Sequence, residues 1–277
     1  MREEADAILE LIVNSSIGLG RRSRRIDILQ RENGDQIVRK IQPINDLSAC
    51  FTEVSADARL LGPLGAGILF ATAERSDYML PLSAHILGEA LRQAAAWPCA
   101  LADLRLSINV TAADIAQPRF MPDLLDLVDR SGFPRARLTV EITESGLIHD
   151  VDAAARLLRA LRSEGLAVAI DDFGTGYSNL ARLKELPVDR VKIDRSLVRD
   201  IATSAEARTI CSAVVGLIQG LGMEVVIEGI ETEAQMEMLR VIGCTLFQGY
   251  HLARPMDEQA YLARFAVPLI MQERRIV

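Results

Sequence analysis

Short apolar runs alternate with helix-like segments along most of this chain. The runs lie at residues 104–111, 137–143, 167–172, 190–197, 223–229 and 245–250. The helical patterns lie near residues 82–96, 120–131, 151–163, 177–185, 205–221, 232–241 and 257–265. Strands that alternate with helices form parallel sheets covered by helices, and units in this number predict an α/β fold, a (β/α)8 barrel.

Each apolar run carries a polar residue at or near its carboxyl end. These residues are Asn109, Glu141, Asp171, Asp172, Lys192, Asp194, Glu228 and Gln248. In a barrel, the carboxyl ends of the strands converge on the face where active sites lie. Carboxylate and amide oxygens suit Mg²⁺ or Mn²⁺ rather than zinc. The sequence therefore predicts a divalent-cation pocket assembled from separate strands.

Two adjacent aspartates, Asp171 and Asp172, follow the apolar run AVAI and precede the segment FGTG. A helix cap is the simpler explanation for an isolated pair of aspartates at a strand end. However, adjacent carboxylates repel each other and are costly to bury unpaired, and a bound cation relieves both effects. The series of polar strand ends favours the cation site over the cap.

Composition excludes several classes of protein. A net charge of -7 argues against a general nucleic-acid surface, which is normally basic. The four cysteines, Cys50, Cys99, Cys211 and Cys244, match neither a zinc spacing nor a disulfide scaffold. Reduced thiols are expected, which favours the cytoplasm. No apolar run approaches the ~20 residues of a membrane span, and the acidic start does not resemble a signal peptide.

Seven segments carry a more specific pattern. They are QPINDL (42–47), SINVTA (107–112), VEITES (140–145), IDDFGTGYSNL (170–180), LPVDRVKIDRSLV (186–198), VVIEGIET (225–232) and GCTLFQGYHLARP (243–255). In order and spacing, from about residue 36 on, they resemble the EAL family of bacterial cyclic-di-GMP phosphodiesterases. The resemblance implies a modified (β/α)8 TIM-type barrel with one antiparallel strand, expected over residues 36–267.

The chain outside this barrel is expected to be simple. Residues 1–35 are predicted to form an N-terminal helix, near 3–13, followed by a linker. The linker contains GLG followed by RRSRR, but a lone GxG is weak evidence for a phosphate loop. Residues 268–277 are expected to form a C-terminal tail.

The EAL resemblance also implies two metal ions, Mg²⁺ or Mn²⁺, and hydrolysis of one phosphodiester of cyclic-di-GMP to give pGpG. Asn109, Glu141 and Asp171 would hold the first ion. Asp171 would bridge to the second ion, which Asp172 and Glu228 would complete.

The remaining roles implied by the resemblance concern catalysis and ligand binding. Lys192 would orient the attacking water, Glu228 would act as the base, and Glu144 would brace the loop after Asp172. The implied ligand-binding residues are Gln42, Arg59, Asp194, Glu231 and Gln248. Two simpler explanations stay open, since Lys192 could pair with an acid and Arg59 could be a surface residue.

The Glu-Ala-Leu motif that names the family is missing. Counting back from Arg59 places Ser55 at the glutamate position, whereas counting forward from Gln42 places Ala56 there. Glu53 would face the same side of a strand as Ser55, but it would lie roughly 6–7 Å further along and would need a bulge to reach the metal. A neutral residue removes one negative ligand, which predicts a weakened first metal site.

Two functions therefore stay open. The missing glutamate and the altered segment 67–82 favour a cyclic-di-GMP-binding effector with impaired catalysis, which we prefer. The other retained residues favour a working phosphodiesterase whose first metal is held by three protein ligands plus water, or by Glu53. Cyclic-di-GMP is the expected partner, and no nucleic acid or membrane segment is expected. A homodimer and a sensor or GGDEF domain in a longer chain are left open.

Overall fold

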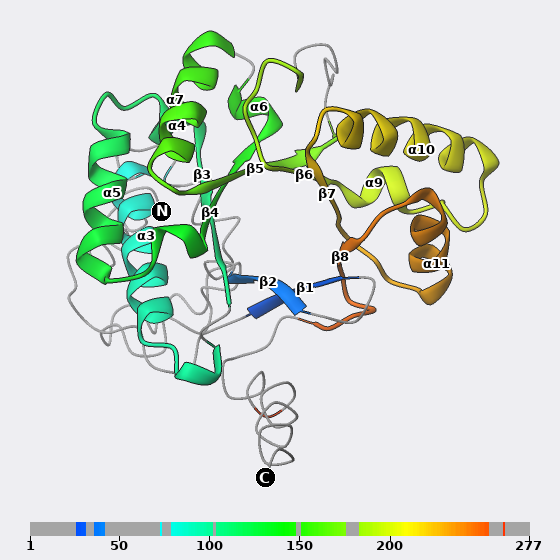
Figure 1. The fold of residues 1–277 in the computed structure, drawn as a ribbon, viewed down its shortest axis with the longest axis horizontal. Coiled ribbons are helices and arrows are strands. Elements are labelled where there is room, and N and C mark those ends of the chain that lie inside the picture. Colours follow the sequence, from blue (N-terminus) through cyan, green and yellow to red (C-terminus); the bar gives the residue numbers. More distant parts are fainter. Residues whose placement is uncertain are drawn as a thin grey trace, which may run out of the picture.

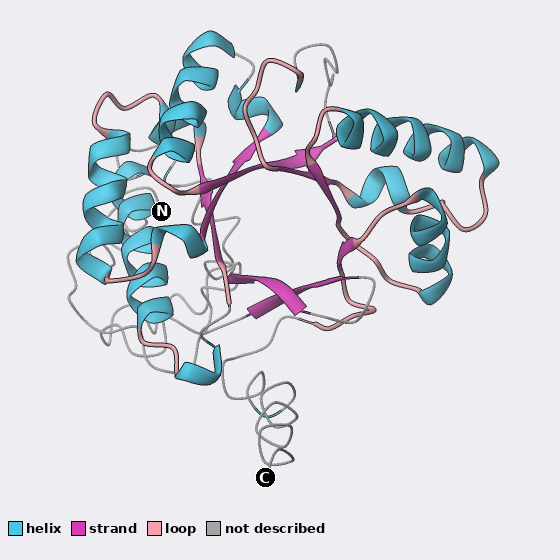
Figure 2. Cartoon of the chain, in the orientation of Figure 1, coloured by secondary structure: helices cyan, strands magenta, loops and turns pink. Residues whose placement is uncertain are grey.

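The computed structural model describes residues 26–31, 36–41, 73, 79–101, 104–147, 151–175, 183–254 and 263. Within these residues the strands close into one barrel, and the helices lie around its outside (Figures 1 and 2). The strands are β1 (Ile26–Arg31), β2 (Gln36–Ile41), β3 (Leu106–Val110), β4 (Leu138–Thr143), β5 (Ala167–Phe173), β6 (Arg190–Ile193), β7 (Glu224–Ile227) and β8 (Leu246–Gln248). The α/β barrel predicted from the sequence is confirmed.

The strands are paired in sequence order around the barrel. From β2 to β8 each strand runs parallel to the next one. β1 runs antiparallel to both of its neighbours, β2 and β8. This arrangement places the carboxyl ends of β3 to β8 at one end of the barrel, where we look for the site.

The helices follow from local sequence signals. The α-helices are α3 (Met79–Ala95), α4 (Ala112–Ile115), α5 (Phe120–Ser131), α6 (Glu144–Leu147), α7 (Val151–Ser163), α9 (Arg195–Val198), α10 (Ala205–Gly220) and α11 (Glu233–Ile242), with 3₁₀ turns η4 (Cys99–Leu101) and η5 (Arg135–Arg137). In α7, Ala154, Leu158 and Leu161 are buried at helical spacing, so one face packs against the barrel. α11 begins with a capping box between Thr232 and Gln235.

Two expectations about the strands are wrong. Residues 26–31 form β1 of the barrel, although we assigned residues 1–35 to a helix and linker. The alternation of apolar and polar residues in IDILQR is short and follows the basic stretch RRSRR. The sequence pattern alone therefore did not predict a strand here. The strand predicted over 190–197 ends at Ile193, because the Asp194 side chain accepts the Ser196 N–H and caps α9.

Other expectations match closely or lie outside the described residues. The remaining five predicted strands and the helices near 82–96, 120–131, 151–163, 205–221 and 232–241 appear within a few residues of their expected bounds. The predicted helices near 3–13, 177–185 and 257–265 and the tail 268–277 lie wholly or mostly outside the described residues. No helix in the described ranges combines the length and the apolar character that a membrane crossing requires.

Candidate metal centre

Lys192 lies at the centre of a cluster of acids inside the barrel. Its Nζ lies 3.1 Å from Glu141 Oε2, 2.5 Å from Asp171 Oδ1 and 2.5 Å from Glu228 Oε1. These residues come from four neighbouring strands of the barrel: Glu141 lies on β4, Asp171 on β5, Lys192 on β6, and Glu228 just after β7. The Lys192 side chain is only 4% exposed and that of Glu228 is 16% exposed. The structure therefore brings together four of the residues predicted to form the site.

The charge of Lys192 is strongly coupled to the acids around it. Burial opposes the charged form of Lys192, but the carboxylates of Glu141, Glu228 and Asp171 outweigh burial and raise its pKa well above the ordinary lysine value. These contacts favour the charged form of the lysine. Within the described residues, the Lys192 ammonium contacts three carboxylates, and such a concentration of acids can attract a divalent cation.

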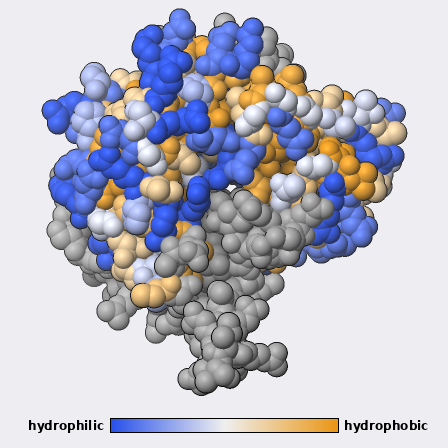
Figure 3. Space-filling model, viewed as in Figure 1, coloured by the Kyte–Doolittle hydropathy of each residue, from blue (hydrophilic) through white to orange (hydrophobic). Residues whose placement is uncertain are grey.

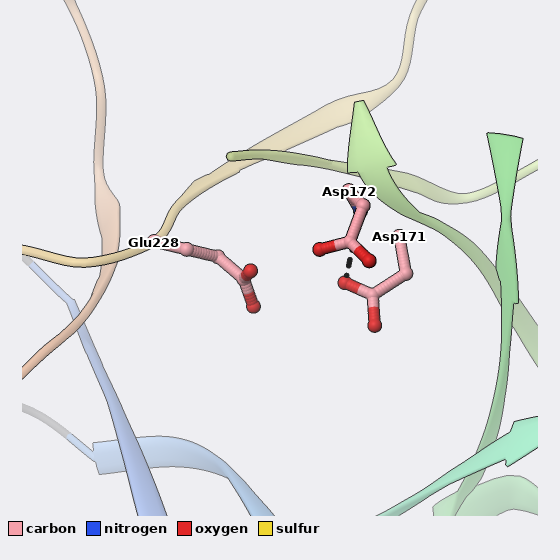
Figure 4. Close-up of side chains that lie close together, drawn as sticks. All are labelled: Asp171, Asp172 and Glu228. Carbon is pink, nitrogen blue, oxygen red and sulfur yellow. Dashed lines mark hydrogen bonds between the residues drawn. The ribbon is translucent and has the colours of Figure 1, made fainter. Parts of the chain in front are cut away.

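Asp171 and Asp172 contribute to one site although they are sequence neighbours. Successive residues of a regular strand point to opposite faces of the sheet. Here the register of β5 against β6 shifts between Ile170 and Phe173, and Asp172 has a positive φ of 55°. This bulge with a left-handed residue turns the Asp172 side chain toward the side of Asp171. Figure 4 shows both carboxylates and that of Glu228 extending into the same space.

Three carboxylates form the group best suited to a metal ion. Asp171, Asp172 and Glu228 each offer one oxygen, and these oxygens lie within 4.8 Å of one another. All of the donors are hard oxygens, which match Mg²⁺ and Mn²⁺. Their number, spacing and negative charge therefore fit a divalent cation.

Two other predicted residues border this group. Asn109 on β3 pairs in register with Glu141 on β4, and the Asn109 side chain is exposed. Glu144, the first residue of α6, accepts the Gly174 N–H at 3.4 Å. This bond joins α6 to the segment that follows Asp172.

The predicted ligand-binding residues within the described ranges surround the same end of the barrel. The Asp194 carboxylate accepts the Ser196 N–H at 2.9 Å; burial opposes its charged form, but the hydrogen bonds from Ser196 outweigh burial and lower the pKa of Asp194. Glu231 follows β7, and Gln248 is the half-buried last residue of β8.

Several predicted residues cannot be placed. Gln42, Arg59, Ser55, Ala56 and Glu53 lie outside the described residues. The geometry of the position left by the missing glutamate therefore stays a prediction.

Sequence reasoning missed three features near the site. The short helix α9 was predicted as strand, and Gln235 received no role beyond its helix. The pattern T-x-x-Q at residues 232–235 is a readable capping-box signal. The β5 bulge left no comparable signal, because a bulge depends on the pairing with β6 rather than on the residues of β5 alone.

Comparison with known proteins identifies the class. The sequence matches the EAL domain family over residues 29–255, so the chain belongs to the EAL domain family. It is 41% identical over 184 residues to cyclic di-GMP phosphodiesterase PA2567 of Pseudomonas aeruginosa, covering 66% of this chain and 31% of that protein. The suspected family membership is confirmed.

Solved structures show the same fold. The structure of the MucR phosphodiesterase of Pseudomonas aeruginosa in complex with c-di-GMP has a TM-score of 0.73 and 30% identity, covering 86% of this chain and 93% of that chain. A manganese and c-di-GMP complex of BlrP1 from Klebsiella pneumoniae has a TM-score of 0.70 and 25% identity, covering 87% and 57% of the two chains. The chain spans about a third of the length of the first curated relatives it matches.

Proposed function

We propose that this chain is a cyclic-di-GMP-binding EAL domain whose hydrolytic activity is impaired and which acts as an effector in cyclic-di-GMP signalling. The observation that carries the proposal is the gathering of Asp171, Asp172 and Glu228 within 4.8 Å at the carboxyl end of the barrel. Relatives that bind or cleave this dinucleotide share the fold and the family. The impairment is inferred from the neutral Ser55 or Ala56 where the family has a metal-binding glutamate.

The residues that would hold the metal ions follow the family pattern. Asn109, Glu141 and Asp171 would hold the first ion, which is the weakened one, and Asp171, Asp172 and Glu228 the second, as Mg²⁺ or Mn²⁺. When bound, two such ions supply Lewis acidity and a water nucleophile for an in-line displacement at phosphorus.

The chain's own residues would divide the remaining work. Glu228 would accept the proton of the attacking water. Lys192 would hold that water in line, and its contacts of 2.5 to 3.1 Å with three carboxylates also keep those acids together. Glu144 would brace the segment after Asp172 through the Gly174 N–H.

The dinucleotide would lie across the carboxyl end of the barrel. Gln42, Asp194, Glu231 and Gln248 would contact it, and Arg59 would pair with a phosphate. The Asp194 carboxylate already caps α9, so the ligand contact would add to an oxygen that is held in place.

A working phosphodiesterase is the second candidate function. The acids around Lys192 favour it, because a domain that only binds the dinucleotide has no need of a general base beside a divalent site. The first metal would then have three protein ligands plus water, or would recruit Glu53.

One experiment separates the two functions. Turnover of cyclic-di-GMP is measured with Mg²⁺ and with Mn²⁺, beside a binding titration in Ca²⁺. We expect binding with little release of pGpG. Brisk turnover that Glu53→Ala abolishes would instead establish the phosphodiesterase.

Partners and location are further proposals. We identify β1 as the one antiparallel strand of the EAL barrel, and we place the protein in the cytoplasm. A sensor or GGDEF domain in a longer chain fits the share of the relatives that this chain covers.

A homodimer has support from the surface. Ile210, Leu217 and Leu221 on and just after α10 are 53%, 40% and 39% exposed, and an apolar area is visible over the helices at that side (Figure 3). Residues 209–222 contain no charged side chain, so two such faces can meet without repulsion. Leu217→Glu should then shift the mass measured by light scattering toward the monomer, and an unchanged mass would exclude this face.

A further inference from the structure

The segments that carry the metal-binding acids meet at α9. Gly174 lies two residues after Asp172 and has a φ of 101°, and a Cβ added to it would overlap the Leu197 side chain. Gly229 directly follows Glu228 at φ 68°, and a Cβ there would overlap the Arg195 side chain. Both glycines therefore allow a close approach to α9 that no other residue type would permit. α9 is the surface against which both acid-bearing segments rest.

Backbone hydrogen bonds fix the two segments at the same place. Asp194 N–H donates to Phe173 O at 3.1 Å, which joins the start of α9 to the end of β5. Glu228 N–H donates to Ile193 O at 3.0 Å, which joins the segment after β7 to the end of β6. α9 thus lies between the strand ends that carry Asp172 and Glu228.

The Gln235 side chain ties the segment after β7 to the far end of α9. Its Oε1 accepts the N–H groups of Glu231 at 2.9 Å and Thr232 at 3.0 Å. Its Nε2 donates to the carbonyl of Arg199, the C-cap of α9, at 3.1 Å. Gln235 is buried, so these bonds are shielded from water. One amide group therefore connects the segment that follows Glu228 to the C-terminal end of α9.

We propose that Leu197 and Gln235 are positioning residues that set the spacing between the Asp171–Asp172 pair and Glu228. The oxygens of the three carboxylates lie within 4.8 Å of one another although like charges repel, and Lys192 Nζ draws Asp171 and Glu228 together at 2.5 Å each. The spacing of the acids also depends on how the segments that carry them are held. α9 and its Gln235 contact hold these segments before any cation binds. The inference rests on the proposed metal site and adds residues that do not touch the metal.

The first test replaces Gln235 by Glu. Gln235→Glu keeps an acceptor oxygen for the N–H groups of Glu231 and Thr232, because Glu serves equally well at this position of a capping box. It removes the donor to the Arg199 carbonyl. We expect Mn²⁺ to bind on the order of tenfold more weakly by calorimetry, as for other residues that orient metal ligands.

A pair of variants at Leu197 tests the inference independently if Gln235→Glu fails to fold. Leu197→Ala removes the side chain on which Gly174 rests, and we expect weaker Mn²⁺ binding. Leu197→Met restores the volume and should restore the parental affinity, since such exchanges are tolerated in packed sites.

A stability control separates positioning from general loosening. Ser204→Ala removes the N-cap hydrogen bond from Ala207 N–H at 3.1 Å at the start of α10, a segment that holds none of the metal-binding acids. Its melting temperature should fall while its Mn²⁺ affinity stays parental. Equal losses of affinity in this control and in Leu197→Ala would overturn the inference.

Two further outcomes separate a failure of this inference from a failure of the proposed metal site. If the parent binds Mn²⁺ and the folded Leu197→Ala and Gln235→Glu variants bind it equally well, the inference is wrong and the metal site stands. If the parent shows no Mn²⁺ binding by calorimetry, the proposed metal site and this inference are both wrong.

Discussion

Two basic residues of β6, two positions apart on the same face of the strand, have opposite surroundings. Lys192, toward the carboxyl end, is 4% exposed and lies within 3.1 Å of three carboxylates. Arg190, at the amino end of β6, pairs through its Nε with Glu224 Oε2 at 2.7 Å. The Arg190 side chain is 11% exposed and that of Glu224 is 47% exposed. Arg190 Nη1 is buried and has no hydrogen-bond partner in the described part of the chain.

The contrast supports the proposal that the functional site lies at the carboxyl end of the barrel. A pair that only closes the barrel needs one acid for each base, as the lower pair of Arg190 and Glu224 has. At the upper end, Lys192 contacts three acids, and repulsion between neighbouring acids reduces stability. A cluster of several acids around one buried base is more typical of a functional site than of a structural ion pair. The comparison can be tested at each end separately.

The largest difference should appear when each base is replaced by Met. In the presence of a chelator, Lys192→Met should lower the free energy of unfolding by about 3–5 kcal/mol, because it removes an ammonium that lies within 3.1 Å of three carboxylates. Arg190→Met should cost less, because the exposed Glu224 can turn to water. Urea denaturation of the two variants measures their free energies of unfolding. Added Mn²⁺ should recover part of the stability of Lys192→Met alone, and equal losses in the two variants would contradict the comparison.

The next effect concerns metal affinity. Asp171→Asn keeps the shape of the side chain but removes the charge that would face both ions, so Mn²⁺ binding should weaken by about 100-fold or more. Glu224→Gln removes an acid of the lower pair and should leave Mn²⁺ affinity unchanged. Calorimetry compares the two. An unchanged affinity in Asp171→Asn would refute the two-metal interpretation of this pocket.

A third prediction adds an acid to the upper end. Ser55→Glu and Ala56→Glu are both needed, because the sequence leaves two registers open and adjacent strand residues point to opposite sides. One of them should raise the rate of pGpG release by at least about tenfold by restoring a metal ligand, and the other should have little effect or destabilise the barrel. Chromatography of the products measures the rate. If both variants still bind cyclic-di-GMP and neither is faster than the parent, the defect lies elsewhere, with segment 67–82 as the first candidate.

The smallest effect belongs to the lower ion pair. Glu224→Gln should change the free energy of unfolding by less than about 1 kcal/mol, because the Glu224 carboxylate is half exposed and such pairs contribute little. Urea denaturation again provides the measurement. A loss of several kcal/mol would mean that the lower pair is as important to folding as the upper cluster.

The sequence predicts the barrel and its acids well, because both depend on local patterns. Asn109, Glu141, Asp171 and Glu228 were found from their place at the ends of apolar runs, and the structure gathers the last three around Lys192. What escaped prediction depends on contacts between distant segments.

Three examples show the limit. The side to which Asp172 points is set by the shifted pairing of β5 with β6. β1 is recognisable as a strand only through its pairing with β2 and β8. The tie from Gln235 to Arg199 spans two helices that no sequence pattern links.

The closure of the barrel has a consequence for the order of folding. β1 pairs with β8, joining Leu29 to Gln248 and Arg31 to Leu246 from opposite ends of the described chain. Loop-closure entropy grows with the length of chain enclosed, so this seam costs more to form than the pairings between consecutive strands. Contacts so distant in sequence form late and slowly. Because Gln248 lies on this seam, this predicted ligand-binding residue reaches its final place only after the first and last strands have met.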